Sequence, residues 1–280
     1  VHVYDPLVAG TIGPVHQDIC YDDTPNQLSF GSASTGAAGL LDYSYQWQES
    51  STGSGPWQDI TIGIFNQSTY SPPSLIQSIY YRVQITSNLC LVTVNSNAVY
   101  INVYADFNAG VIGNDQNICY GDAPSQHSFN ITSPPSGGNI PYSYQWEKSL
   151  TGTGNWSNVG GNISTYQPPA LTQTTYYRVR VTSNSSCGVL ITNMVKDSVY
   201  NQMVGAIISG NDTICDSTTP NQLSMTQPPT GGGNVSYTYQ WQQSSTGSGN
   251  WNDITGETGT TYQSLPLIAS TYYRLRSSSS

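Results

Sequence analysis

The sequence predicts an all-β protein in which one small domain is repeated three times. Aromatic and aliphatic residues alternate with polar ones in the segments around Trp47 and Val83, which is the period of a strand buried on one face. Gly, Pro and Asn interrupt the chain roughly every eight to twelve residues, as turns between short strands do. No window carries apolar residues at helical spacing over several turns. We therefore expect strands and turns, and no helix.

Two motifs, Tyr-x-Tyr-Gln-Trp and a later Tyr-Tyr-Arg, mark each copy of the repeat. Their spacing gives a period of about 97 residues, which is the size of a small domain and is too long for a solenoid repeat. The first motif lies at residues 43–47, 142–146 and 237–241, and the second at residues 80–82, 176–178 and 272–274.

The boundaries of the copies follow from these motifs. Residues Val1 to Tyr4 resemble Ile101 to Tyr104, which close the first copy, so the chain is expected to open with the last strand of a preceding copy. The third copy stops just after its Tyr-Tyr-Arg strand, and we therefore expect a segment of a longer array. The predicted divisions are a last strand at 1–8, repeat 1 at 9–104, repeat 2 at 105–203 and a truncated repeat 3 at 204–280.

The predicted fold of each copy is a sandwich of two β-sheets. About seven short strands, with a Trp on a central strand and a Tyr at the start of a late strand, are typical of immunoglobulin-like and fibronectin-III-like domains. Trp47 and Tyr81 occupy those positions in repeat 1, and the same alternation of apolar and polar residues recurs in the other copies. The sequence thus predicts tandem β-sandwich domains in an extended array.

The charge of the chain excludes several classes of partner. Only 8% of residues are charged, with 16 acidic against 7 basic residues and a formal net charge of -9. Nucleic-acid binding needs clustered Lys and Arg, and the only lysines are Lys148 and Lys196. Attraction to an anionic membrane is disfavoured for the same reason, and no apolar run is long enough to span a bilayer. We predict no nucleic-acid partner and no direct membrane insertion.

Five cysteines occupy two positions of the repeat. Cys20, Cys119 and Cys215 are the first cysteines of their copies, whereas Cys90 and Cys187 follow the Tyr-Tyr-Arg strand. We expect one disulfide within each complete copy, Cys20 to Cys90 and Cys119 to Cys187, stapling one end of the sandwich. The partner of Cys215 would lie past the last residue. Such bonds indicate an oxidising compartment. The alternative is that the cysteines are buried free thiols.

No residue pattern predicts catalysis, a cofactor or a metal. The three histidines fall at different positions of the repeat, so they do not form a recurring acid–base or metal site. The carboxylates after the first cysteine are too few for the six to eight oxygens of a Ca²⁺ site and are expected to form turns. These residues are His2, His16 and His127, and Asp22, Asp23, Asp122 and Asp216.

The second tryptophan of each copy is the candidate ligand-facing residue. Exposed on a sheet edge, Trp57, Trp156 and Trp251 would each offer a flat apolar face to a sugar ring, whereas burial would make them part of the core. Burial is the favoured interpretation. A recurring Arg is expected on the outward face of the Tyr-Tyr-Arg strand, in a polar cross-strand contact with a Gln. The expected pairs are Arg82 with Gln46, Arg178 with Gln145, and Arg274 with Gln240.

Four motifs of repeat 2 together resemble the repeats of SprB-type gliding adhesins, giant multi-repeat surface proteins of Bacteroidetes. The resemblance covers essentially the whole chain. It implies export by the type IX secretion system and display as a long filament at the cell surface. No catalytic residues carry over from these repeats. The motifs are Ile-Cys-Tyr-Gly-Asp at 118–122, Tyr-Ser-Tyr-Gln-Trp at 142–146, Tyr-Gln-Pro-Pro-Ala-Leu at 166–171 and Thr-Tyr-Tyr-Arg-Val at 175–179.

The predicted function is that of a structural stalk or filament segment of a large secreted cell-surface adhesin. It would be non-catalytic and would give extended reach and multivalent attachment, in gliding or adhesion. Its partners would be the neighbouring repeats and a surface polysaccharide or substratum. One alternative is an array of carbohydrate-binding modules that uses the recurring Trp and Tyr residues. Another is an extracellular fibre that self-associates through edge strands.

Overall fold

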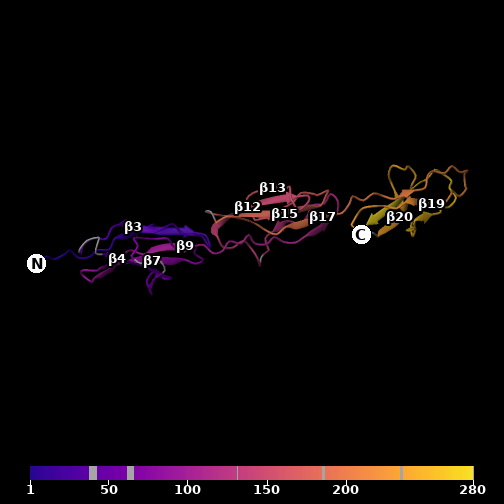
Figure 1. Ribbon diagram of the computed structural model, residues 1–280. Coiled ribbons are helices and arrows are strands. Elements are labelled where there is room, and N and C mark those ends of the chain that lie inside the picture. Colours follow the sequence, from indigo (N-terminus) through magenta and orange to yellow (C-terminus); the bar gives the residue numbers. More distant parts are fainter. Residues whose placement is uncertain (38–42, 62–65, 131, 185–186, 234–235, 280) are drawn as a thin grey trace. The chain divides into compact units, whose positions relative to one another are not determined.

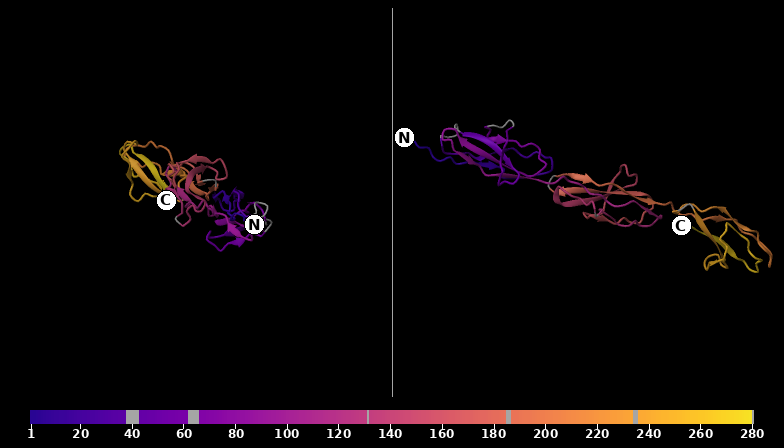
Figure 2. Two further views of the ribbon diagram at one scale, coloured as in Figure 1. Left: turned by 90° about the vertical axis from the view of Figure 1, so that its left-hand side faces the viewer. Right: turned by 90° about the horizontal axis from the view of Figure 1, so that it is seen from below.

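The computed structural model describes residues 1–37, 43–61, 66–130, 132–184, 187–233 and 236–279. Every regular element among them is a β-strand, which confirms the all-β prediction (Figure 1). Two further views show strands and connecting loops throughout (Figure 2). In this part of the chain there is no helix of the length and apolarity that a membrane crossing would need.

Repeat 1 contains two sheets that pack face to face. One has the strand order β2-β9-β7-β4-β5, with β8 paired to β7, and the other has the order β1-β3-β6. β2 runs parallel to β9, and the other pairs are antiparallel. Figure 1 shows β3 on one side of the domain and β4, β7 and β9 on the other. The strands are β1 (Thr11–Gly13), β2 (His16–Ile19), β3 (Leu28–Ser32), β4 (Tyr43–Ser50), β5 (Gln58–Asp59), β6 (Thr69–Tyr70), β7 (Ile79–Ser87), β8 (Thr93–Asn95) and β9 (Val99–Val103).

The core of repeat 1 lies between its two sheets. Trp47 on β4 is fully buried, and Tyr81 and Val83 on β7 are buried while the residues between them are partly exposed. This alternation is the one that the sequence predicts, because successive side chains of a strand point to opposite faces. Leu28 and Ile12 of the smaller sheet cover the same core from the other side. Burying each large side chain stabilises the fold by about 1.5–3 kcal/mol relative to its exposure.

The larger sheet of repeat 2 is arranged as in repeat 1, whereas its smaller sheet has two described strands, β11 and β14, in place of three. Its larger sheet has the order β10-β17-β15-β12-β13, with β16 paired to β15, and β11 pairs with β14. β10 is again parallel to β17. Trp146 and Tyr177 are fully buried, like Trp47 and Tyr81 of repeat 1. The strands are β10 (Gln116–Ile118), β11 (His127–Ser128), β12 (Asn139–Ser149), β13 (Ser157–Val159), β14 (Thr165–Tyr166), β15 (Thr175–Asn184), β16 (Val189–Ile191) and β17 (Val195–Val199).

Repeat 3 has a smaller core, formed by Trp241, Tyr262 and Leu275. Its described residues contain no strand that corresponds to β9 or β17. A groove of about 850 Å³ lies on that side, lined by residues 208–216 and by Tyr272 and Tyr273 of β23. Its sheets have the orders β18-β19-β22 and β21-β20-β23. The strands are β18 (Ile207–Ile208), β19 (Leu223–Gln227), β20 (Tyr237–Ser244), β21 (Asn252–Asp253), β22 (Thr261–Tyr262) and β23 (Tyr272–Ser279).

The pairing of the described strands predicts that β23 is less protected than its counterparts β7 and β15 in this 280-residue chain. β7 and β15 are each flanked by two strands of the larger sheet, whereas β23 pairs only with β20 among the described strands. Fewer paired and buried amides lower the local free energy of opening. We expect amides of β23 to exchange with deuterium faster than those of β7 and β15 in hydrogen-exchange mass spectrometry. Equal protection of the three strands would contradict this prediction.

Candidate functional site: the junction between successive repeats

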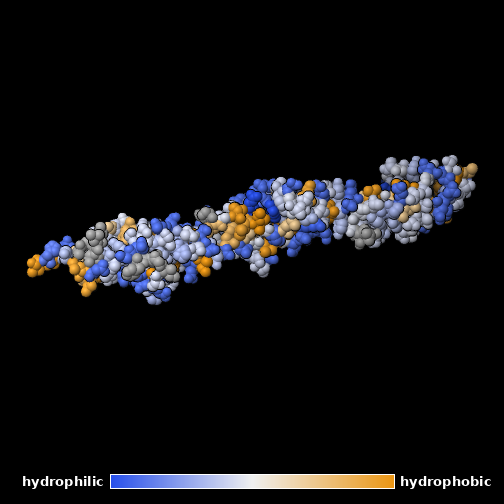
Figure 3. Space-filling model, in the orientation of Figure 1, coloured by the Kyte–Doolittle hydropathy of each residue, from blue (hydrophilic) through white to orange (hydrophobic). Residues whose placement is uncertain are grey.

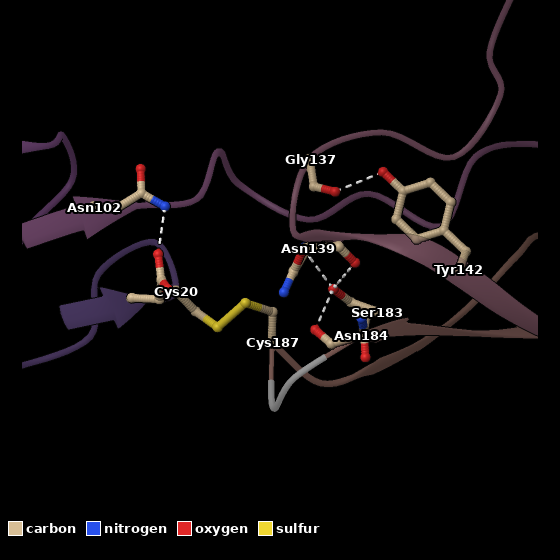
Figure 4. Close-up of a disulfide and its surroundings, with 9 residues drawn as sticks. Cys20, Asn102, Gly137, Asn139, Tyr142, Ser183, Asn184 and Cys187 are labelled. Atoms are coloured by element: carbon tan, nitrogen blue, oxygen red, sulfur yellow. Dashed lines mark hydrogen bonds between the residues drawn. A yellow bond between two sulfur atoms is a disulfide. The ribbon is translucent and has the colours of Figure 1, made fainter. Parts of the chain in front are cut away.

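A disulfide bond joins Cys20 of repeat 1 to Cys187 of repeat 2, with their Cα atoms 5.3 Å apart (Figure 4). This corrects the expected pairing. The bonds from Cys20 to Cys90 and from Cys119 to Cys187 are absent, and Cys90, Cys119 and Cys215 are exposed free thiols. The bond therefore links two successive repeats and does not staple either of them internally. A disulfide is typical of an extracellular, oxidising setting.

The strand register explains why Cys20 and Cys90 are not bonded. β2 runs parallel to β9, so Cys20, which follows β2, lies beyond the Ile79 end of the adjacent strand β7. Cys90 follows the opposite end of β7, after Ser87. β7 has 9 residues, so its ends are about 26 Å apart at about 3.3 Å per residue. A disulfide needs Cα atoms within about 7 Å of each other.

The same register separates the two cysteines of repeat 2. Ile118 at the end of β10 pairs with Val199, and Thr175 at the start of β15 pairs with Asp197. Cys119 is therefore level with the start of β15, whereas Cys187 follows its end. In each repeat the first cysteine thus lies where the chain leaves the domain, and the second lies at the other end.

Cys187 lies beside the segment through which the chain enters repeat 2. Ser183 at the end of β15 accepts a hydrogen bond from the Asn139 backbone N–H at 2.8 Å (Figure 4). The neighbouring Gly138 N–H donates to the carbonyl of Ala105, the first residue of the repeat, at 2.7 Å. Cys20, Cys187 and the linker between the repeats all belong to one compact unit, made of residues Val1–Val111, Asn130–Gln145 and Val179–Thr192.

The linker is held by a contact that requires glycine. Gly137 has a φ of +69°, and a Cβ added there would lie 1.8 Å from the carbonyl oxygen of Asp106. Only Gly allows this approach at positive φ. The Gly137 carbonyl accepts a hydrogen bond from the Tyr142 hydroxyl at 2.6 Å (Figure 4). We call these two contacts, of Gly137 with the linker residue Asp106 and of Gly137 with the Tyr142 hydroxyl, the linker clamp.

Repeats 1 and 3 have the same linker clamp. Gly36 lies against Pro6, and Gly231 lies against Gln202, with positive φ in both cases. The first Tyr of the Tyr-x-Tyr-Gln-Trp motif supplies the hydroxyl each time, which explains why this position recurs. The corresponding bonds run from Tyr43 to Gly36 at 2.5 Å and from Tyr237 to Gly231 at 2.8 Å.

An exposed carboxylate lies on the repeat 1 side of the disulfide. Asp18 on β2 accepts a hydrogen bond from the Asn102 amide at 2.8 Å, across the parallel pair of β2 and β9. This hydrogen bond holds the pKa of the Asp18 carboxyl below its ordinary value. The two strands that position Cys20 are thereby tied together at the edge of repeat 1.

The recurring tryptophans are covered on one face by arginine. Each ring is partly buried, and the guanidinium carbon of the Tyr-Tyr-Arg residue lies over it, which is the geometry of a cation–π contact. The distances from that carbon to the ring centroid are 4.3 Å for Arg82 over Trp57, 4.0 Å for Arg178 over Trp156 and 4.4 Å for Arg274 over Trp251.

The hydrogen-bond partners of these arginines differ from those expected. Register pairs Arg82 with Gln48, two residues beyond the predicted Gln46, which pairs with Gln84. Gln46 and Gln48 lie on the same face of β4, so the prediction named the correct face and the neighbouring position on it. The arginine Nε donates to Gln48 at 2.8 Å in repeat 1, to Glu147 at 2.7 Å in repeat 2 and to Gln242 at 2.6 Å in repeat 3.

Replacing the arginine is expected to lower the free energy of unfolding more in repeat 2 than in repeat 3. Glu147 is buried and ion-paired to Arg178, whereas the acceptor for Arg274 is a neutral amide. Arg178→Gln leaves a buried carboxylate without its cation and should destabilise by about 2–3 kcal/mol. The matched change Arg274→Gln should cost about 1 kcal/mol. Urea denaturation followed by tryptophan fluorescence measures both, and equal losses would contradict the prediction.

The residues considered for metal or acid–base chemistry do not gather into a site. Over the described ranges, no group of three or more His, Cys, Asp or Glu side chains is placed to hold a metal ion. Asp22 and Asp23 lie in the turn after β2, where their N–H groups donate to backbone carbonyls. His16 stacks on Tyr100. His127 Nε2 lies within hydrogen-bond distance of the buried Asp197 carboxylate, a contact that the sequence did not predict.

These domains define a tandem array of immunoglobulin-like or fibronectin-III-like β-sandwiches. The chain belongs to the family described as "Domain of unknown function (DUF8696)", whose profile matches residues 8–105, 108–201 and 204–280. No curated protein sequence matches the chain.

Three solved structures of multidomain proteins are similar to the chain. The N-terminal domains of the highly immunogenic outer capsid protein of bacteriophage RB49 are 13% identical, with a TM-score of 0.34, over 95% of this chain and 86% of theirs. Chicken CNTN1 domains FN1–FN3 are 14% identical, with a TM-score of 0.33, over 98% and 93%. Sidekick-1 immunoglobulin domains 1–4 are 12% identical, with a TM-score of 0.36, over 96% of this chain and 65% of theirs.

Proposed function

We propose that the chain is a stalk or filament segment of a large secreted cell-surface adhesin of the SprB type. The observation that carries this proposal is the covalent bond between Cys20 and Cys187, which joins successive repeats. A linker bridged by a disulfide and held by the linker clamp resists bending and extension, as a load-bearing spacer must. The segment has no catalytic role, and its export follows the type IX route.

Attachment would come from many weak contacts along the array. Multivalency raises overall avidity without strong individual sites. The low charge of the chain, 8%, limits nonspecific ion pairing with the many charged surfaces around a cell. A surface polysaccharide or substratum is the partner that this role implies, in gliding or in adhesion.

Small-angle scattering of the oxidised chain tests the stalk. We expect a maximum dimension of about three times that of a single repeat, since each repeat is a small domain of its own. A compact particle would contradict the proposal. Latex beads coated with the chain should also adhere to a polysaccharide-coated surface with a strength that rises more steeply than in proportion to coating density. Adhesion proportional to density would argue against multivalency.

A self-associating fibre is the second candidate, favoured by one edge strand. β16 carries three consecutive exposed apolar residues, Val189, Leu190 and Ile191, and pairs only with β15 among the described strands. Apolar side chains reach the surface of repeat 2 around β12 (Figure 3). Exposed apolar edges favour pairing between chains. A particle size that rises with concentration, and that Leu190→Lys abolishes, would support the fibre over the stalk.

A carbohydrate-binding array remains a proposal that rests on the recurring tryptophans. Each ring is partly exposed at the same position of its repeat, although an arginine covers one face. Glycan-array binding that is lost in Trp156→Ala, with the fold preserved by circular dichroism, would favour this role. Binding unchanged by the substitution would exclude Trp156 as the contact.

A further inference from the structure

The three free cysteines occupy the same repeat positions as the two bonded ones. Cys119 and Cys215 match Cys20, the first cysteine of repeat 1, and Cys90 matches Cys187, the second cysteine of repeat 2. All three free thiols are exposed. Each of them therefore corresponds to one half of an observed bond between repeats.

We propose that the Cys20–Cys187 bond is one of a regular series, in which the first cysteine of each repeat bonds to the second cysteine of the following repeat. Under this rule Cys119 is the cross-linking site for repeat 3, and Cys215 would serve a repeat joined after repeat 3. Cys90 would serve a repeat joined before repeat 1. The inference rests on strand register and repeat equivalence, and it does not depend on the adhesive role proposed above.

The strands present Cys119 as they present Cys20. Cys119 follows β10, which is parallel to the last strand of its repeat, β17, as β2 is parallel to β9. The Tyr200 N–H donates to the Ile118 carbonyl at 3.0 Å, as the Tyr104 N–H donates to the Ile19 carbonyl at 2.9 Å. The chain therefore leaves repeat 2 beside its first cysteine, as it does in repeat 1.

The end of repeat 3 at which the chain enters the domain resembles the same end of repeat 2. A Cβ added to Gly138 would lie 2.5 Å from the Ser183 hydroxyl, and one added to Gly232 would lie 2.6 Å from the Ser279 hydroxyl. The Gly232 N–H donates to the Asn201 carbonyl at 2.8 Å, which repeats the bond from Gly138 to the linker of repeat 2. Ser279 is therefore the counterpart of Ser183, and Cys187 lies four residues after Ser183.

A cavity lies where the second cysteine of repeat 3 would arrive. It has a volume of about 630 Å³, and Cys119 and Tyr200 line it from repeat 2 while Gly232 and Ser279 line it from repeat 3. If the chain is extended past Ser279 with the residues that follow Ser183, the added cysteine comes four residues after Ser279. The thiol of Cys119 is thus held beside the position that the rule assigns to its partner.

The reaction is an ordinary thiol–disulfide exchange. The oxidant is a small disulfide such as oxidised glutathione, and the thiolate of one cysteine attacks it to form a mixed disulfide and release one thiol. The second cysteine attacks the mixed disulfide and releases the other thiol. Two protein thiols lose two protons and two electrons, and one small disulfide becomes two small thiols.

Thiol mapping of the whole oxidised chain gives the first test. The chain is equilibrated with reduced and oxidised glutathione, alkylated under denaturing conditions and digested. We expect a linked peptide pair that contains Cys20 and Cys187, with Cys90, Cys119 and Cys215 alkylated. Linkage of Cys20 to Cys90 and of Cys119 to Cys187, with Cys215 as the single thiol, would overturn the proposal.

An extended chain tests the rule at a second junction. Residue 280 is replaced by a copy of residues 184–203, which supplies repeat 3 with a second cysteine and a last strand. The rule predicts a bond between Cys119 and the added cysteine, and two remaining thiols, Cys90 and Cys215. Pairing within repeats would leave none.

Two matched variants of the extended chain identify the partner. Cys119→Ser should abolish the new bond and leave the added cysteine open to alkylation, whereas Cys215→Ser should leave the bond intact. Both positions are exposed, so neither change disturbs a core. If Cys215→Ser abolishes the bond, or if Cys119 stays a free thiol in the oxidised extended chain, the proposal is wrong.

Discussion

Reducing the Cys20–Cys187 bond is expected to lengthen the fully unfolded chain by about 55–60 nm when it is pulled from its two ends. The two cysteines are 167 residues apart in sequence, and an extended chain spans about 3.3–3.6 Å per residue. While the bond is intact, force passes directly from Cys20 to Cys187, and the residues between them cannot be stretched. Single-molecule force spectroscopy with and without a reductant measures the difference in contour length.

Cysteine variants give the controls for this measurement. Oxidised Cys187→Ser should already reach the length of the reduced chain, because it cannot form the bond. Cys90→Ser should behave as the unmodified chain does, since Cys90 is a free thiol. If Cys90→Ser increased the length of the oxidised chain, Cys90 would be in a disulfide and the observed pairing would not hold in solution.

The position of the bond determines which parts of the protein it shields from tension. The closed loop contains strands β3 to β9 of repeat 1, the linker, and most of repeat 2 up to β15. A pulled chain can therefore lose the packing of both cores without extending fully. If the series of bonds proposed above holds, successive loops overlap, since the loop that starts at Cys119 begins before Cys187. Every linker would then be spanned by a disulfide bond.

Much of the fold could be predicted from the sequence because its signal is local. Alternation around Trp47 and Val83 identifies β4 and β7 and their buried faces, and both residues are fully buried in the structure. The disulfide pairing could not be predicted in the same way. It depends on which end of the domain each cysteine occupies, and hence on β2 being parallel to β9, a pairing between segments about 80 residues apart in the chain.

The linker clamp and the arginine contacts also depend on pairings between distant segments, which the local sequence does not reveal. The recurrence of Tyr43, Tyr142 and Tyr237 was visible, but their hydroxyl contacts with Gly carbonyls join a strand to a loop whose path the sequence does not reveal. The arginine partner was misplaced by one position on the correct strand face, because register is set by the whole strand pair. Residue type predicted the kind of contact, and register decided the partner.

A buried histidine–aspartate pair in repeat 2 replaces an apolar pair of repeat 1. His127 Nε2 lies 3.0 Å from Asp197 Oδ2, and the side chains are 2% and 0% exposed. His127 pairs with Tyr166 in the sheet as Leu28 pairs with Tyr70, and Asp197 is opposite Gln116 as Ile101 is opposite Gln17. Two positions that are both apolar in one repeat are thus both ionisable in the other.

The surroundings of this pair leave polar atoms without partners. Among the described residues, Asp197 Oδ1 and the Tyr177 hydroxyl are buried and have no hydrogen-bond partner. Burial, with smaller contributions from the charges at Tyr166 and Asp197, raises the pKa of Tyr177 well above its ordinary value. An unsatisfied buried polar atom costs about 1–3 kcal/mol, so the His127–Asp197 pair is a poor source of stability.

We expect the single change Asp197→Ala to destabilise repeat 2 by about 1–3 kcal/mol, because it leaves the buried His127 Nε2 without its hydrogen-bond partner. The double change His127→Leu with Asp197→Ile, which copies Leu28 and Ile101 of repeat 1, should instead be neutral or stabilising by about 1–4 kcal/mol. Hydrogen exchange of β12 and β15 amides, together with urea denaturation, measures both effects.

The reciprocal graft in repeat 1 completes the comparison. Leu28→His with Ile101→Asp places the histidine–aspartate pair in a core that is otherwise apolar and should destabilise repeat 1, since burying polar groups there costs more than their mutual contact returns. Local exchange in β7 then rises while that in β15 is unchanged. If the double change in repeat 2 proved as destabilising as Asp197→Ala alone, the His127–Asp197 pair would be a net stabilising element. The unpaired oxygen of Asp197 and the hydroxyl of Tyr177 would then need partners that form in solution.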